Sequence, residues 1–199
     1  MREIASFTSR NRWIVSDEIY HGLVYEGHER TILEFTTQAF VINGFSKAYA
    51  MTGFRLGYLI APKPFVRPLR ILHQNFFISA NSFVQKAGIA ALREGETFLQ
   101  GTRSLFNERR RVMLEGIQRL GMTVAVPPTG AFYIFANAKK FTKNSLRFAR
   151  ELLQATGVGV TPGVDFGSAG EGHLRFSYAA SLENIREGLK RIAQYLEKC

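Results

Sequence analysis

Residues 43–58, NGFSKAYAMTGFRLGY, place a single lysine, Lys47, between an apolar run and a glycine-containing turn. The apolar residues 40–42 lead into this stretch, and a second apolar run, residues 56–61, leads out of it. Short apolar runs bounded by turn residues are typical of buried β-strands. A lysine at the end of a buried strand is partly desolvated, which lowers the pKa of its ammonium group and makes the amine a nucleophile toward aldehydes. Lys47 is therefore the candidate reactive group, and a plain surface lysine at a loop tip is the alternative.

A second strand pattern, residues 14–20 (IVSDEIY), predicts a short buried strand that runs into a carboxylate, Asp17. In open α/β sheets, ligands bind outside the carboxyl ends of the strands, so Asp17 and Lys47 are expected to share one site. Pyridoxal phosphate chemistry requires this pair: a lysine that forms a Schiff base, and an acid that keeps the pyridine nitrogen protonated.

Five spaced motifs extend this pattern along the whole chain: SDEIYHGLVYEG, NGFSKAYAMTGFRLGYLIAP, PPTGAFYIF, GVGVTPGVDFG and HLRFSYA. In this order they resemble the fold-type I, class I and II aminotransferase family, in the branch of prokaryotic aspartate-aminotransferase-like enzymes. The resemblance implies that Lys47 forms the Schiff base with pyridoxal phosphate and that Asp17 pairs with the pyridine nitrogen. It also implies that Tyr20 contacts the phenolic oxygen, Arg55 the cofactor phosphate, and Arg175 the substrate α-carboxylate.

The residue pattern around Arg55 is consistent with phosphate binding. Arg55 lies between Gly53 and Gly57, and small neighbours let a guanidinium approach a phosphate without obstruction. A surface ion pair is the alternative. Ser46 could donate its hydroxyl to the same phosphate, although it could equally cap the turn.

Arg175 alternates with Leu174 and Phe176 in an apolar strand pattern, so its side chain is expected on the opposite face. An arginine inside a hydrophobic strand requires an anion. A substrate carboxylate is favoured over a structural ion pair, mainly because of the HLRFSYA resemblance.

The fold class expected is α/β: the C-terminal part of the cofactor-binding large domain, with a mixed, mostly parallel sheet, followed by a small α+β domain. Residues 64–120 show helical spacing with a break near 78–81, and the domains are divided near Asn107, into 1–106 and 107–199. Downstream, strands are expected at 123–126, 131–136, 158–161 and 173–177, and helices at 145–155 and 182–198. By resemblance, the chain is the C-terminal half of a family member and is expected to hold its cofactor poorly by itself.

The composition excludes several other classes. The formal net charge is +10, but the basic residues are scattered, and the densest run, Arg109–Arg110–Arg111, is interpreted as a solvated helix face. No nucleic-acid motif accompanies it, so no nucleic-acid partner is expected. A single cysteine, Cys199, and the absence of a long apolar stretch favour a cytoplasmic protein with no membrane contact. The four histidines lack zinc-site spacing, so no metal is expected.

The sequence thus predicts a pyridoxal-phosphate-dependent aminotransferase that moves an amino group between an amino acid and a 2-oxo acid, in a homodimer by resemblance. A lyase with the same fold, a cofactor-sensing module of a transcription regulator, and a basic binding protein without catalysis are the alternatives. No residue indicates a pocket for a distal carboxylate of the substrate, so the sequence does not predict which amino acid is the substrate.

Overall fold

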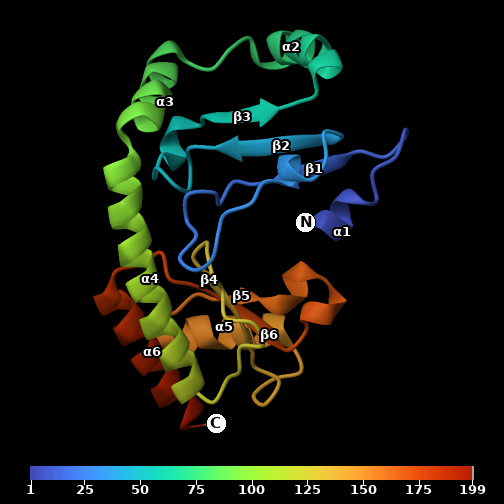
Figure 1. Cartoon of the computed structure of the whole chain (residues 1–199). Helices are drawn as coiled ribbons and strands as arrows, with labels where there is room; N and C mark the ends of the chain where they lie inside the picture. The colour runs from blue at the N-terminus through green and yellow to red at the C-terminus, as the bar shows by residue number, and fades with distance from the viewer. Residues whose placement is uncertain (199) are drawn as a thin grey trace. The chain divides into compact units, whose positions relative to one another are not determined.

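The computed structural model describes residues 1–198 and divides into two compact units. Unit 1 is Met1–Arg103, and unit 2 begins at Ser104. This division and the one expected near Asn107 both fall within helix α4 (Glu96–Arg119). Cys199, on which the expected cytoplasmic location partly depends, lies outside the described residues. Figure 1 shows strands and helices in each unit, so the expected α/β class is confirmed.

Unit 1 contains a three-stranded mixed sheet in the order β1–β2–β3. Strand β1 (Ile14–Asp17) runs parallel to β2 (Ala39–Gly44), and β2 is antiparallel to β3 (Gly57–Ile60). In the register of the parallel pair, Asp17 lies beside Ile42. The carboxyl ends of β1 and β2 therefore meet at one edge of the sheet, as the sequence predicts.

One face of this sheet carries a small apolar core. Ala39 and Val41 of β2 are buried against Ile32, which belongs to the 3₁₀ turn η1 (Ile32–Glu34), and against Ala5 of the short helix α1 (Arg2–Ala5). On the other face, a ring cluster made by Trp13, Phe40 and Phe65 covers part of the sheet.

Much of the remaining sheet surface is open, as expected for a chain that resembles half of a family member, whereas the prediction that residues 14–20 form a buried strand is wrong. Val15 of β1 is 65% exposed and Leu59 of β3 is 45% exposed. Their apolar side chains favour burial, but in unit 1 the elements that pack on the sheet cover only parts of its two faces.

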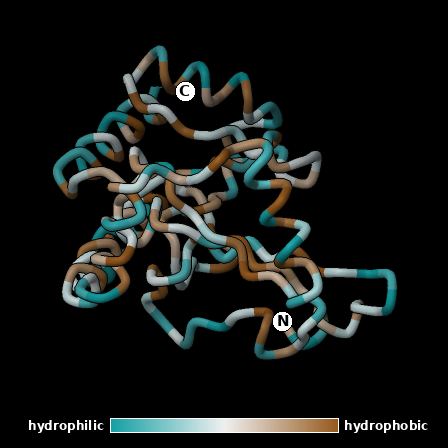
Figure 2. The backbone as a smooth tube through the Cα atoms, turned by 90° about the horizontal axis from the view of Figure 1, so that it is seen from above, coloured by the Kyte–Doolittle hydropathy of each residue, from teal (hydrophilic) through white to brown (hydrophobic). Residues whose placement is uncertain are grey.

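Three helices follow the sheet along the chain: α2 (Lys63–Phe77), α3 (Ser82–Glu94) and α4. The helical spacing and the break near 78–81 are therefore confirmed. Asn81 caps α3 by accepting a hydrogen bond from the backbone N–H of Phe83 at 3.2 Å. Figure 2 shows hydrophobic and hydrophilic stretches alternating along the helices, as amphipathic helices require.

Unit 2 contains a three-stranded antiparallel sheet in the order β4–β6–β5. Its strands are β4 (Tyr133–Asn137), β5 (Thr161–Pro162) and β6 (His173–Ser177), and its later helices are α5 (Ser145–Thr156) and α6 (Leu182–Leu196). The buried core of this unit is apolar and includes Ile134, Leu152, Leu174, Phe176 and Ile192.

Three details of unit 2 correct the sequence predictions. Residues 123–126 form no strand: a single residue of this range, Thr123, pairs with Asn137 in an isolated bridge. The strand expected at 158–161 is reduced to Thr161–Pro162. Arg110 does not lie on a solvated helix face: it is only 4% exposed, and its Nη1 donates to the carbonyl oxygen of Pro128 at 2.6 Å. The acceptor lies 18 residues away in the chain, so sequence spacing cannot reveal this hydrogen bond.

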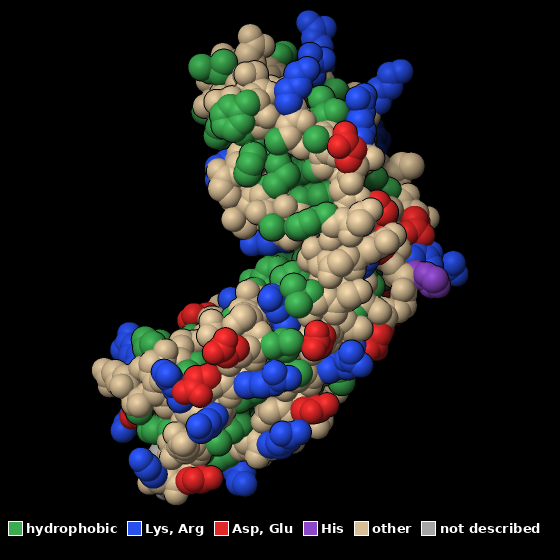
Figure 3. Space-filling model, turned by 90° about the vertical axis from the view of Figure 1, so that its left-hand side faces the viewer, with side chains coloured by type: hydrophobic (Ala, Val, Ile, Leu, Met, Phe, Trp, Pro, Cys, Tyr) green, Lys and Arg blue, Asp and Glu red, His purple; other side chains and the backbone are tan. Residues whose placement is uncertain are grey.

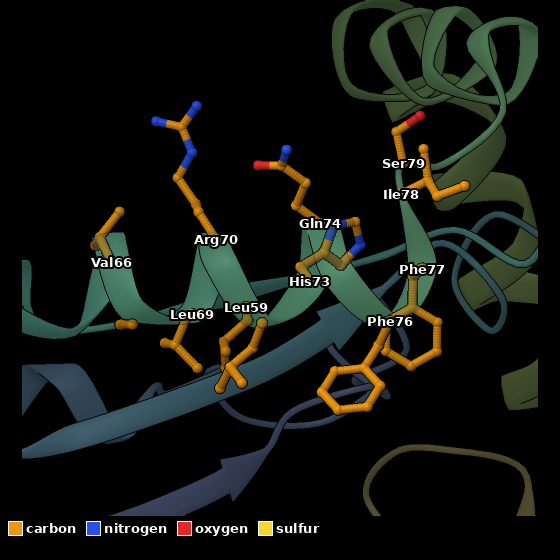
Figure 4. Close-up of a pocket in the computed structure, with 12 residues that line it drawn as sticks. Leu59, Val66, Leu69, Arg70, His73, Gln74, Phe76, Phe77, Ile78 and Ser79 are labelled. Carbon is orange, nitrogen blue, oxygen red and sulfur yellow. The ribbon is translucent and has the colours of Figure 1, made fainter.

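Most of the large hydrophobic side chains that are exposed belong to unit 1. On the face shown in Figure 3, hydrophobic side chains gather over unit 1, whereas acidic and basic side chains are interspersed over unit 2. Unit 1 also has a groove of about 800 Å³ between α2 and β3. Figure 4 shows Leu59 and Leu69 between the helix and the strand, Phe76 and Phe77 at the helix end, and Arg70 pointing away. This groove is apolar and contains none of the predicted site residues.

Residues 1–198 contain neither a membrane-spanning helix nor a cluster of metal-ligand side chains. No helix in this range has both the length and the apolar character needed to cross a membrane. Within the same residues, no three side chains of histidine, cysteine, aspartate or glutamate come together as metal ligands.

A carboxylate at the start of α5 gives a pH-dependent prediction. Glu171 accepts hydrogen bonds from the backbone N–H groups of Ser145 at 2.6 Å and Gly172 at 2.7 Å, and these bonds lower its pKa. A lowered pKa in the folded state stabilises the protein above the unfolded-state pKa, and this contribution is lost as the pH falls through the folded-state pKa. We expect Glu171→Gln to lower the melting temperature at neutral pH, and the difference from wild type to disappear on acidification.

Circular dichroism melts of wild type and variant across this pH range would measure the difference. Glu108→Gln is the matched control, because Glu108 is an exposed glutamate of the same unit. A constant difference at every pH would contradict the role given to the Glu171 carboxylate.

Candidate active site

Asp17 is the last residue of β1, and its side chain is exposed at the sheet edge. One carboxylate oxygen accepts a hydrogen bond from the backbone N–H of Ile19 at 3.1 Å, which orients the group. Among residues 1–198, Asp17 forms no ion pair with lysine, arginine or histidine. Its negative charge is therefore available to a cationic group from outside the chain.

Lys47 lies in a turn that begins where β2 ends, and three buried apolar residues anchor this turn. Phe45, Ala48 and Met51 are all below 9% exposed. Backbone hydrogen bonds close the loop, from the N–H of Phe45 to the carbonyl of Leu56 at 3.2 Å and from the N–H of Met51 to the carbonyl of Phe45 at 3.3 Å. Lys47 itself is half-buried, because it follows one anchor and precedes the other two.

The loop after Asp17 packs directly against the turn that carries Lys47. A β-carbon at Gly22 would lie 2.9 Å from Cβ of Ala48, and one at Gly44 would lie 3.3 Å from Cδ1 of Ile19. These close approaches connect the segment that follows Asp17 with the turn that carries Lys47. Tyr20 is half-buried within the first of these segments, three residues after Asp17.

Aromatic rings in and beside the same turn contact one another. The ring of Phe45 lies 5.6 Å from that of Tyr49 and 6.0 Å from that of Tyr58. Burial raises the pKa of both tyrosines, and Glu96 adds to the effect at Tyr49. The upward shift of these pKa values indicates that the environment around this turn is only partly solvated.

Arg55 occupies a strained position after the 3₁₀ turn η2 (Thr52–Phe54). Its backbone is left-handed, with φ 54° and ψ 42°, a conformation that few residues other than glycine adopt. Nη1 donates to the carbonyl oxygen of Thr52 at 2.9 Å, and the side chain is exposed. Within the described part of the chain Arg55 has no carboxylate partner, so the surface ion pair considered as an alternative does not form. Ser46, the other predicted phosphate ligand, is half-buried beside Lys47.

Arg175 lies in unit 2, in the middle of β6. Leu174 and Phe176 are buried on the opposite face of the strand, which confirms the predicted alternation. Nη2 of Arg175 donates to Oγ1 of Thr161 at 3.3 Å. No carboxylate of residues 1–198 lies within ion-pair distance of Arg175, although other arginines in this range, such as Arg103 and Arg147, have glutamate partners.

Sequence reasoning missed Glu18, a buried carboxylate that organises the loop containing Tyr20. Glu18 is 5% exposed and accepts hydrogen bonds from Oγ of Ser16, Oγ1 of Thr31 and the backbone N–H of Ile32, at 3.0, 3.1 and 2.9 Å. In the sequence Ser16–Asp17–Glu18, strand alternation places the side chains of Asp17 and Glu18 on opposite faces of the strand. This alternation is the signal that could have identified one carboxylate as exposed and the other as buried.

Comparison with known families gave one match that extends over almost the whole chain. The model of the family described as "Aminotransferase class I and II" matches residues 1–192. A (5-formylfuran-3-yl)methyl phosphate transaminase from Methanocaldococcus jannaschii is 43% identical over 99% of this chain and 54% of its own length. An aspartate aminotransferase from Pyrococcus horikoshii is 37% identical over 94% of this chain and 49% of its own length. The chain thus spans about half the length of the relatives that it matches.

Solved structures agree with the sequence matches. A Methanococcus jannaschii protein, described as similar in its active site to kynurenine aminotransferases, superposes with a TM-score of 0.90 at 42% identity and covers 98% of this chain and 53% of its own. An aromatic aminotransferase from Pyrococcus horikoshii superposes with a TM-score of 0.92 at 30% identity, with 98% and 54% covered.

Proposed function

The chain belongs to the class I and II aminotransferase family, and from this we propose that it is the part of a pyridoxal-phosphate-dependent aminotransferase that contains the reactive lysine. The reaction proposed moves an amino group between an amino acid and a 2-oxo acid. One observation carries the proposal: Asp17 and Lys47 follow two paired parallel strands at the same sheet edge, in segments that pack on each other.

Three observations on this chain fit pyridoxal phosphate. Asp17 has no cationic partner among the described residues, and a pyridinium would supply one. Lys47 is half-buried, and Arg55 is a cation without a carboxylate partner in the same range. When bound, pyridoxal phosphate supplies an aldehyde and an electron-accepting ring.

Each predicted site residue of unit 1 then has a defined role. Lys47 would hold the cofactor through its aldehyde group, with loss of water, and the free Lys47 amine would accept the proton that leaves the substrate α-carbon. Asp17 holds a proton on the pyridine nitrogen, since a carboxylate beside a cation favours the charged form of both groups. Arg55 binds the phosphate with charge-assisted hydrogen bonds, and Ser46 adds a hydroxyl donor. Tyr20 donates to the phenolic oxygen of the ring.

Arg175 binds the α-carboxylate of the substrate in this proposal. Its lack of a carboxylate partner in residues 1–198 supports the assignment, because a half-buried guanidinium is stabilised by an anion. The relatives are named for aspartate and for a furan phosphate, among others, so we leave the substrate as an amino acid and its 2-oxo acid partner.

We further propose that unit 1 is the C-terminal part of the cofactor-binding large domain and that unit 2 is the small domain. A homodimer and a cytoplasmic location complete the proposal, on the family resemblance and on the single cysteine respectively.

The test is a hybrid protein, in which this chain is joined to the part of the Methanocaldococcus jannaschii relative that the match leaves out. We expect the hybrid to retain pyridoxal phosphate through dialysis and to release 2-oxo acids from some members of an amino-acid panel. We expect the 199-residue chain alone to lose the cofactor in the same dialysis, because it spans only about half the length of the relatives that it matches.

The outcomes separate the candidate functions. A hybrid that consumes amino acids but releases carbon dioxide or ammonia, with no transfer of the amino group, would favour a lyase over an aminotransferase. Sustained turnover by the 199-residue chain alone would refute the partial-enzyme proposal. The lyase and the cofactor-sensing module have no observation in this chain that favours them.

A further inference from the structure

The sheet of unit 2 has two chemically different faces. Ile134, Leu174 and Phe176 point into the core and are almost fully buried. The opposite face carries aromatic and polar side chains, because strand residues alternate. Arg175 stands in the middle of this second face, between Phe135 of β4 and Thr161 of β5 in the strand register.

Two aromatic rings contact the guanidinium of Arg175. Its Cζ lies 4.3 Å from the ring centroid of Tyr133 and 4.8 Å from that of Phe166. Tyr133 belongs to β4, and Phe166 ends the 3₁₀ turn η3 (Gly163–Phe166). The rings attract the cation through their π-electrons and cover part of its surface, but they carry no charge that would neutralise it.

The edge of the guanidinium keeps its hydrogen-bond donors. An arginine side chain has five N–H donors in a planar fork, and the Thr161 hydroxyl accepts from only one of its nitrogen atoms, Nη2. A planar carboxylate needs two parallel N–H groups from such a fork. Rings that fix the plane of the guanidinium therefore reduce the rotamer freedom that a carboxylate would have to restrict on binding.

The backbone on both sides of Phe166 is closely packed at Gly163 and Gly170. A β-carbon at Gly163 would collide with the carbonyl oxygen of Gly170, and one at Gly170 would collide with the carbonyl oxygen of Gly163. The ring of Phe135 also meets the ring of Phe166 edge-on, at 5.6 Å and 86°. Phe166 is 50% exposed, so contacts of this kind, rather than burial, hold it in place.

We propose that Tyr133 and Phe166 are positioning residues that hold the Arg175 guanidinium with its edge open to the substrate carboxylate. This inference rests on the proposed function, in which Arg175 binds that carboxylate. We call the two rings and Thr161 the arginine clamp.

The experiment measures how fast phenylglyoxal labels Arg175 in the full 199-residue chain, by peptide mass spectrometry, in acetate and in chloride at equal ionic strength. Arg150, exposed on α5, is the internal reference. We expect acetate to slow the labelling of Arg175 by about threefold or more, as bidentate charge-assisted binding predicts, and to leave Arg150 unchanged.

Removal of either ring should abolish this protection. We expect Tyr133→Leu and Phe166→Leu to be labelled at the same rate in both salts, and Tyr133→Phe and Phe166→Tyr to keep the protection because they keep a ring. Phe141→Leu is the matched control, since Phe141 stacks on Phe148 and lies outside the clamp. If Tyr133→Leu does not fold, the half-exposed Phe166 supplies the decisive variant.

The two levels of the proposal fail in different ways. Equal protection in wild type and in the folded leucine variants would overturn the clamp and leave the carboxylate role of Arg175 standing. Absence of acetate protection in wild type would overturn that role and the clamp with it. A purely structural role for the rings would lower the melting temperature of the leucine variants without changing the acetate effect.

Discussion

Lys47→Ala is expected to remove the pyridoxyl group that borohydride fixes to this chain in the presence of pyridoxal phosphate. Lys47 alone among the lysines follows a strand end whose parallel neighbour ends in a carboxylate, Asp17. Its turn is anchored by buried residues on both sides, so the amine is held in one region. Borohydride reduces the transient adduct before the cofactor dissociates, and the measurement therefore does not require a stable complex.

The matched control is Lys86→Ala, which removes an exposed lysine of α3 in the same unit. Peptide mass mapping should place the pyridoxyl group on Lys47 in wild type and in this control. In the hybrid protein, Lys47→Ala should reduce turnover by about 10²–10⁴-fold or more, the range for loss of a positioned acid–base group. A pyridoxyl group found mainly on another lysine would contradict the assignment.

The second prediction separates the roles of Asp17 and Arg55. In the hybrid, Asp17→Ala should lower kcat strongly even at saturating cofactor, because the ring nitrogen loses the carboxylate that keeps it protonated. Arg55→Ala should weaken cofactor binding by roughly 10- to 100-fold, the loss of a charge-assisted hydrogen bond, and leave kcat near wild type once cofactor saturates.

The left-handed backbone at Arg55 supplies a sharp control. Alanine and arginine are both strained at φ 54°, whereas glycine is not. Arg55→Gly should therefore match or exceed the stability of Arg55→Ala and still bind the cofactor weakly. The measurements are cofactor titrations and kcat at saturation. If Arg55→Ala lost turnover at saturating cofactor as completely as Asp17→Ala, the two roles would have been assigned wrongly.

The sequence alone predicted the parts of the site that depend on local pattern. Strand-end residues such as Asp17 are visible because apolar runs stop where the chain reaches a sheet edge. Helices α2, α3 and α4 were predicted because their apolar spacing persists over several turns. The alternation around Arg175 indicated its face in the same way.

Features that depend on contacts between distant segments were not predicted. Glu18 is a buried anchor because Thr31 and Ile32 fold back onto it, and Arg110 is buried because the carbonyl of Pro128 reaches it. The local pattern of residues 14–20 predicted a buried strand, yet Val15 is 65% exposed, because an apolar side chain favours burial without indicating which segment covers it.

The backbone contact between Gly163 and Gly170 limits which substitutions the protein can accept at these two positions. Neither glycine contacts a ligand in our proposal. A side chain at either position would nevertheless collide with the backbone of the other glycine and push the two segments apart. Phe166 lies between these glycines along the chain, so we expect its contact with Arg175 to depend on the same backbone packing. Substitutions at Gly163 and Gly170 should therefore be tolerated as poorly as substitutions at Arg175. A ranking of positions by distance from the substrate would underestimate the importance of both glycines.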